Sequence, residues 1–162
     1  NTISDGSVNF VNALSVAESR GIVVEENVVH HVQDFANQIT LSVTCEDKTN
    51  LIAGTLFGNK NYRFVRFNDF YLEVIPDGYI LALHNYDRPG VIGKVTSILG
   101  SHQINVSRMQ LTLDKTFVQG SSESCLQEAV SFINIDQPVN DAILEELLKL
   151  ENIITVHQID LN

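Results

Sequence analysis

The stretch that decides the fold is residues 79–93, which read YILALHNYDRPGVIG. An apolar run at 79–83 leads through the turn residues 87–90 directly into a helical pattern. A strand that stops at a helix start leaves backbone N–H groups unpaired, and these suit an anion such as a carboxylate. Asp87 adds a negative side chain that suits an ammonium group. The stretch therefore predicts a site for a small zwitterion, with an amino acid as the obvious candidate.

Composition limits the classes of function. The chain has 162 residues, 44% of them apolar and 19% charged, which favours a folded core in one domain or two small ones. A formal charge of −10 argues against nucleic acid as a partner. The sequence has no membrane-span pattern and no signal peptide, and its two cysteines are too few for a disulfide framework or a metal cluster. We expect a cytoplasmic protein, with an organelle as the open alternative.

The second half of the chain has the order β-α-β-β-α-β, which is the ferredoxin-like arrangement of a four-stranded sheet with two helices on one face. Helical spacing of apolar residues follows the first and third strands, and alternation marks the strands. Asn140 is the expected N-cap of the second helix. The expected strands are Tyr79–His84, a strand through Met109, Leu111 and Leu113, Ala129–Ile135 and Ile153–Leu161.

The first half predicts one short helix, with Phe10, Leu14 and Ala17 on its apolar side, and a mostly antiparallel set of strands. The expected strands are Ile39–Cys45, which we expect to be half-buried, Leu51–Phe57, Tyr62–Phe67 and Phe70–Ile75. The class is α+β, divided at a Pro-Asp-Gly turn into residues 1–76 and 77–162. Because the first part is thin for an independent core, we expect it to pair with a second copy or to be poorly ordered.

Two groups of motifs resemble known families. Asp87–Val95, Leu99-Gly100, Ile104–Val106 and Met109–Leu111 resemble an ACT domain, an amino-acid-sensing module of metabolic enzymes. The upstream half resembles the allosteric substrate-binding, or intervening, domain. The residues that carry this second resemblance are Val8–Ala13, Glu18–Ile22, Ala53–Gly58 and Arg66–Asn68. The two in this order are similar to the C-terminal regulatory region of the D-3-phosphoglycerate dehydrogenase family.

This resemblance implies a regulatory segment that binds L-serine at an interface between two ACT domains for feedback control. It implies that Asn85 and Asp87 contact the effector, and that Asn105 reaches the ligand of the neighbouring chain. The N–H groups near Val91 and Ile92 suit the carboxylate, and the Pro89-Gly90 pair allows a close approach of the backbone. The alternative is structural: Asp87 caps the helix, and Asn105 fills a turn. The motif by itself does not choose serine over another small amino acid.

We expect no catalytic residue in this segment. No Gly-x-Gly-x-x-Gly loop follows a strand, so we expect no bound cofactor here and place NAD in the catalytic domains of the presumed parent dehydrogenase. Two alternatives stay open. One is the regulatory region of another amino-acid enzyme such as L-serine dehydratase, and the other is an oligomerisation module that senses nothing.

A second candidate site is basic. Lys60, Arg63 and Arg66 lie within seven residues of one another, and the resemblance implies an anion site for a phosphorylated substrate in some members. Strand alternation predicts that Arg63 and Arg66 face opposite sides of their strand and form no single clamp. A solvated surface is the favoured alternative, because charges on a strand keep it from pairing with others.

Overall fold

The computed structural model describes the chain except residues 1–7, 29–34, 36, 47, 59 and 114–126. It divides into two compact units, Asn1–Asp34 and Phe35–Asn162. The first unit contains helix α1 (Ala13–Ser19), preceded by a turn in which the Asn9 side chain accepts the N–H of Val11 at 2.9 Å. The predicted helix is confirmed from Ala13 onward, whereas Phe10, which was predicted on its apolar side, lies in the turn before it. None of the helix residues is buried, so its apolar side has no core of its own within this unit.

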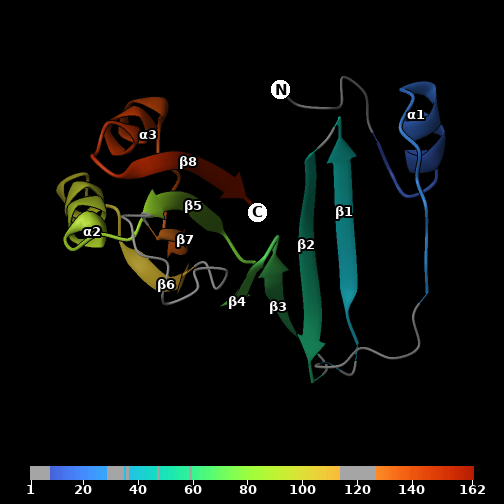
Figure 1. The fold of residues 1–162 in the computed structure, drawn as a ribbon, viewed down its shortest axis with the longest axis horizontal. Helices are drawn as coiled ribbons and strands as arrows, with labels where there is room; N and C mark the ends of the chain where they lie inside the picture. The colour runs from blue at the N-terminus through green and yellow to red at the C-terminus, as the bar shows by residue number, and fades with distance from the viewer. Residues whose placement is uncertain (1–7, 29–34, 36, 47, 59, 114–126) are drawn as a thin grey trace, which may run out of the picture. The chain divides into compact units, whose positions relative to one another are not determined.

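Sheet A is an antiparallel meander in the second unit (Figure 1). Its strands are β1 (Ile39–Cys45), β2 (Lys48–Phe57), β3 (Asn61–Phe67) and β4 (Phe70–Val74), and they lie in that order across the sheet. The last two are joined by a two-residue turn, Asn68-Asp69, where Asn68 has a φ of 50°. The four predicted strands are therefore confirmed, with their ends shifted by three residues at most.

The expected half-burial of β1 is wrong. All seven residues of the strand are exposed, including Ile39, whose side chain is 82% exposed. The burial within sheet A is on β2 to β4, where Val74 is 2% exposed. Alternation of apolar and polar residues predicted the strand correctly, but alternation alone cannot say whether another layer covers its apolar face.

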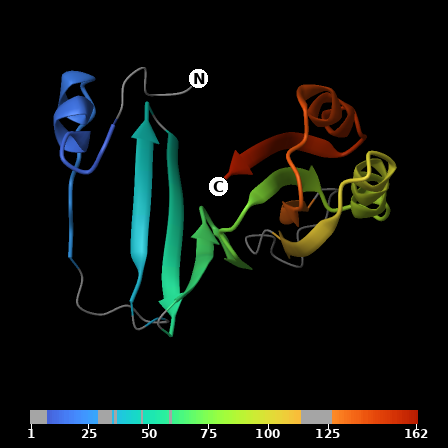
Figure 2. The same cartoon turned by 180° about the vertical axis from the view of Figure 1, so that it is seen from behind.

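Sheet B has the order β6-β7-β5-β8, and its two helices lie on one face of it (Figure 2). This is the predicted ferredoxin-like topology, with every strand antiparallel to its neighbours. The elements are β5 (Tyr79–Tyr86), α2 (Val91–Ser101), β6 (Val106–Leu113), β7 (Glu128–Ile135), α3 (Asp141–Leu148) and β8 (Ile153–Asp160).

The main core lies between the helices and sheet B. Leu83, Val95 and Leu147 in this core are at most 1% exposed. A second cluster joins the opposite face of sheet B to sheet A, where the rings of Phe67 and Phe132 meet edge to face at 5.9 Å. Sheet B is therefore covered on both faces, which holds its strand ends in fixed positions.

Local polar contacts set the ends of the elements. The Asn140 side chain accepts the N–H of Ile143 at 3.0 Å, which confirms the predicted cap of α3. Asn134 is 5% exposed, and its Nδ2 donates to the carbonyls of Ile75 and Asp77 at 3.2 and 3.1 Å. Because these carbonyls belong to the segment between β4 and β5, Asn134 fixes the connection between the two sheets.

No described helix is long and apolar enough to cross a membrane.

Candidate effector site and basic pocket

Asn85 is a buried polar residue of the predicted effector site. It lies near the end of β5 on the side of sheet B that faces the helices, and it is 1% exposed. Its Nδ2 donates to the carbonyl of Tyr86 at 2.9 Å, but its Oδ1 has no hydrogen-bond partner in the described structure. A buried acceptor without a donor costs roughly 1–3 kcal/mol. The position therefore favours a ligand that supplies a donor.

Asp87 follows the end of β5 and holds its backbone in place by donating its N–H to the carbonyl of Gln127 at 2.7 Å. Its side chain is exposed and makes no contact with another described residue that would neutralise the carboxylate. The N-cap of α2 is Gly90, with no side-chain capping bond, so Asp87 is not the cap that the structural alternative required. By contrast, the nearby Glu128 carboxylate is contacted by His84 at 2.6 Å.

The first turn of α2 follows Asp87 closely in the sequence and presents backbone N–H donors. Gly90 adopts the left-handed conformation with a φ of 89°, which turns the chain sharply into the helix. Val91 directs its N–H to the carbonyl of Arg88 at 3.3 Å, and Lys94 makes the first helical bond, to Gly90. The N–H groups of Ile92 and Gly93, which lie between Val91 and Lys94 in the chain, have no acceptor among the described residues. Gly93 was not among the residues predicted from the sequence, although its place in the first turn follows from the predicted helix start.

Asn105 lies just before β6, and its backbone is fixed by the carboxylate of Asp136. The Asn105 N–H donates to Asp136 Oδ1 at 2.9 Å, and the Asn105 carbonyl accepts the N–H of Asp136 at 3.2 Å. The side chain is exposed. It can therefore turn toward a ligand or a neighbouring molecule without any change in the backbone.

Within one chain, Asn105 is far from Asn85. The register places Asn85 opposite Ala129 and Val106 opposite Ile135, at the two ends of β7. Six residues of extended strand separate these positions, which is about 20 Å. The structure therefore brings together Asn85, Asp87 and the start of α2, but it leaves Asn105 at the other end of the sheet.

The three basic residues predicted as an anion site do not form one cluster. Lys60 is exposed in the turn before β3. Arg66 is used within the β3–β4 hairpin, where its Nε donates to the carbonyl of Asn68 at 2.7 Å and its guanidinium lies 5.6 Å from the ring centre of Tyr71. Arg63 instead contacts Glu73 across the same hairpin, with its Nε 3.4 Å from Oε1.

The expectation that Arg63 and Arg66 face opposite sides is wrong. Arg63 pairs with Thr55 and Arg66 with Ala53, two residues of β2 that share a face. The register shifts between Phe64 and Arg66, so one extra residue in β3 restores the two arginines to the same side. A bulge of this kind has no marker in the sequence, because its residues are ordinary strand formers.

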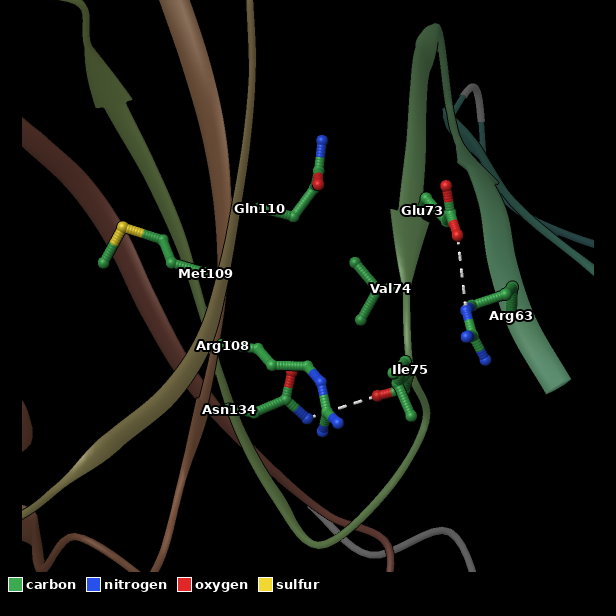
Figure 3. Close-up of a pocket in the computed structure, with 8 residues that line it drawn as sticks. All are labelled: Arg63, Glu73, Val74, Ile75, Arg108, Met109, Gln110 and Asn134. Carbon is green, nitrogen blue, oxygen red and sulfur yellow. Dashed lines mark hydrogen bonds and ion pairs between the residues drawn. The ribbon is translucent and has the colours of Figure 1, made fainter. Parts of the chain in front are cut away.

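Arg63 lines a pocket of about 380 Å³ between β4 and sheet B (Figure 3). The other wall carries Arg108 and Gln110 of β6 with Asn134 of β7. In Figure 3 the ion pair of Arg63 and Glu73 lies on one side of β4, and Arg108 lies on the other. Arg108 makes no hydrogen bond or ion pair with a described residue, so it is the uncompensated cation of this pocket. Sequence reasoning missed it because it lies 45 residues after Arg63.

Two family models match the chain in succession. Residues 1–68 match the D-3-phosphoglycerate dehydrogenase intervening domain, and residues 79–152 match the ACT domain. Two D-3-phosphoglycerate dehydrogenases, from Archaeoglobus fulgidus and Bacillus subtilis, are each 32% identical over 98% and 97% of the chain. The chain is homologous to the regulatory region of D-3-phosphoglycerate dehydrogenases. The predicted resemblance is thereby confirmed for both halves.

The chain spans less than a third of these relatives, 29% and 28% of their lengths. A different relative is covered more completely: the probable L-serine dehydratase beta chain of Bacillus subtilis is 30% identical over 91% of the chain and 63% of its own length. Within the ACT domain, the two described parts of the candidate site lie at the β5–α2 junction and at the start of β6. Among the described residues, no group of three His, Cys, Asp or Glu side chains is arranged to hold a metal ion.

Proposed function

We propose that this chain is the regulatory part of a D-3-phosphoglycerate dehydrogenase and that it binds L-serine between the ACT domains of two copies. The observation that carries the proposal is the buried Asn85, whose Oδ1 lacks a donor among the described residues and which lies two residues before the exposed carboxylate of Asp87. In this proposal the oxidation of 3-phosphoglycerate, and the NAD that it requires, belong to the remaining length of the parent enzyme. We place that enzyme in the cytoplasm.

The polar groups of the site match the parts of an amino acid. The Asp87 carboxylate accepts from the ammonium group, and the N–H groups of Ile92 and Gly93 donate to the carboxylate at the start of the helix. We assign the side-chain hydroxyl of serine, rather than a further N–H of its ammonium group, as the donor to Asn85 Oδ1. Glycine, alanine and valine have no such hydroxyl, so the unpaired Oδ1 is the feature that selects serine among them.

The position of Asn105 supports binding between two copies. β6 is an edge strand of sheet B, so a second copy can pair with it. Antiparallel pairing of the two β6 strands brings Asn105 of one copy to the end of the sheet where the other copy has Asn85 and Asp87. Each ligand then contacts both chains, and its binding favours one arrangement of the pair. Feedback control of the parent enzyme follows if that arrangement is less active.

The test is calorimetric titration of the chain with L-serine, glycine, L-alanine and L-valine. We expect selective binding of L-serine, and loss of that binding in Asp87→Ala and in Asn105→Ala. Glu151→Ala, which changes an exposed carboxylate after α3, is the matched control and retains binding. A folded dimer that binds none of these amino acids refutes serine sensing and favours the oligomerisation module. Serine binding by itself does not distinguish the dehydrogenase from an L-serine dehydratase, which the similarity to a dehydratase beta chain keeps as the alternative parent.

We also propose an anion site in the pocket between β4 and sheet B. The uncompensated Arg108 supports it, with Arg63 as a second cation that must first leave Glu73. The ligand class is a phosphorylated small molecule such as 3-phosphoglycerate, and Lys60 and Arg66 take no part because they lie outside the pocket. Titration with 3-phosphoglycerate is expected to show binding that weakens at least tenfold in Arg108→Ala and strengthens in Glu73→Gln. Equal affinity in all three chains refutes the site.

A further inference from the structure

Asn85 Oδ1 is one of two buried side-chain atoms that lack a hydrogen-bond partner in the described part of the chain. The other is Oγ of Ser131, a residue of β7 that is 0% exposed. Most buried polar groups in native proteins are paired, because an unpaired one costs stability. The hydroxyl of Ser131 is therefore a second polar group that the fold buries without using it.

The register of sheet B places Ser131 next to Asn85. β5 and β7 are antiparallel neighbours in this sheet (Figure 1), and Ser131 lies opposite Leu83. Asn85 lies two residues beyond Leu83 on the same strand and therefore on the same face. Since Leu83 belongs to the core between the helices and sheet B, this is the face that the helices cover. Asn85 and Ser131 are thus diagonal neighbours on the helix-facing side of the sheet.

The other neighbours of Ser131 on this face offer it no partner. By register and by alternation along the strands, they are the apolar residues Leu81, Leu83, Met109, Leu111, Leu113, Ala129 and Ile133. Asn85 is the one polar side chain among these described neighbours, and no hydrogen bond joins it to Ser131. The two orphaned atoms are complementary, because Asn85 Oδ1 only accepts, whereas a hydroxyl can also donate.

We propose that Ser131 is a second specificity-determining residue of the effector site and that it binds the side-chain hydroxyl of L-serine together with Asn85. This inference rests on the proposed function. The ligand hydroxyl donates to Asn85 Oδ1 and accepts the O–H of Ser131. One oxygen that bonds to both atoms at about 2.8 Å spans up to roughly 5.6 Å between them. That span suits diagonal neighbours, whose Cβ atoms lie roughly 7 Å apart and whose polar atoms extend into the same layer.

This pair of partners distinguishes a hydroxyl from other ligand groups. An ammonium group only donates and a carboxylate only accepts, whereas a hydroxyl does both with one atom. The methyl group of alanine does neither, so bound alanine leaves both buried atoms unpaired. A site of this kind discriminates against the analogue that lacks the hydroxyl, because its own polar groups then stay unsatisfied. Ser131 therefore raises the preference for serine and contributes nothing to binding of the amino-acid part that serine and alanine share.

Calorimetry on two chains with two ligands tests the role of Ser131. The wild-type chain and Ser131→Ala are titrated with L-serine directly and with L-alanine by competition. We expect the variant to bind L-serine about fivefold more weakly, the value of one hydrogen bond. Its affinity for L-alanine is expected to stay within about twofold of the wild-type value. The control is Ser101→Ala, which removes an exposed hydroxyl at the far end of α2 and is expected to keep both affinities.

The outcomes separate this inference from the proposed function. If the wild-type chain binds L-serine and Ser131→Ala leaves both affinities unchanged, or weakens both by the same factor, the inference is overturned and the proposed function stands. If the wild-type chain binds no L-serine, the proposed function is overturned and this inference with it.

Thermal unfolding without ligand separates binding from a structural role. Ser131→Ala is expected to unfold at the wild-type temperature or above it, because the hydroxyl that it removes has no partner to lose. A fall in melting temperature as large as that of Asn140→Ala, which loses the capping hydrogen bond of α3, would show that the Ser131 hydroxyl is paired in the ligand-free chain. That result also overturns the inference.

Discussion

The two buried asparagines of the ACT domain predict opposite responses to the same substitution. Asn85 has one satisfied group and one unpaired acceptor, whereas Asn134 donates two hydrogen bonds to the segment between the sheets. Replacing Asn85 with leucine, of similar size, removes the cost of the unpaired acceptor, roughly 1–3 kcal/mol, and loses one hydrogen bond worth about 1 kcal/mol. We therefore expect Asn85→Leu to raise the free energy of unfolding of the ligand-free chain by about 1 kcal/mol.

The same substitution at Asn134 is expected to destabilise. Asn134→Leu loses two hydrogen bonds and takes from the Asp77 carbonyl the donor that Asn134 supplies, whereas the Ile75 carbonyl keeps the N–H of Asp77 at 3.0 Å, for a total of about 2–4 kcal/mol. Urea unfolding followed by circular dichroism measures both effects, since the chain has no tryptophan to report by fluorescence. The comparison of two variants within one domain cancels differences in the unfolded chain to a first approximation.

Ligand linkage completes the experiment. If the proposed site is correct, L-serine at a hundred times its dissociation constant stabilises the wild-type chain by about 2.7 kcal/mol and stabilises Asn85→Leu far less. A stabilised variant that no longer responds to serine would identify Asn85 as a residue kept for binding at a cost in stability. The reasoning is refuted if Asn85→Leu destabilises the ligand-free chain as much as Asn134→Leu, because Asn85 would then be a fully paired structural residue.

Three further predictions concern stability. Leu99→Ala should cost about 2–5 kcal/mol in urea unfolding, because Leu99 is a fully buried residue of α2, and a loss below 1 kcal/mol would contradict that packing. Asn140→Ala should cost about 1 kcal/mol through the lost cap of α3, whereas Asn140→Ser should recover most of it in thermal unfolding. Gly90→Ala should cost about 1–2 kcal/mol, since its φ of 89° disfavours a side chain although no atom lies within 4 Å of the added carbon. An unchanged melting temperature for Gly90→Ala would show that the turn can relax.

The sequence predicted the ACT domain well because each of its elements carries its own local signal. Helical spacing at Val91, Val95 and Leu99 marks α2, and these are the residues that the structure buries in that helix. The role of Asn140 as the N-cap of α3 was predictable because short polar side chains are preferred at the start of a helix. Such signals depend on neighbours in the chain, so a single sequence contains them.

Other features depend on residues that are distant in sequence. The exposure of β1 depends on whether another layer covers it, and the common face of Arg63 and Arg66 depends on an unmarked bulge. The approach of Arg108 to the pocket that Arg63 lines requires the contact between the two sheets. The missing donor at Asn85 is likewise visible only when all its neighbours are known.

The separation of Asn105 from Asp87 along the sheet has a consequence for complementation between mutant alleles. If each effector is held by Asp87 of one copy and Asn105 of the other, a mixed pair that joins an Asp87→Ala chain to an Asn105→Ala chain has one site with both defects and one with neither. Two alleles that are each insensitive to serine would thus restore partial control when expressed in one cell. The intact site would appear in half of the assembled pairs if the chains mix at random, and it would be absent from either strain alone.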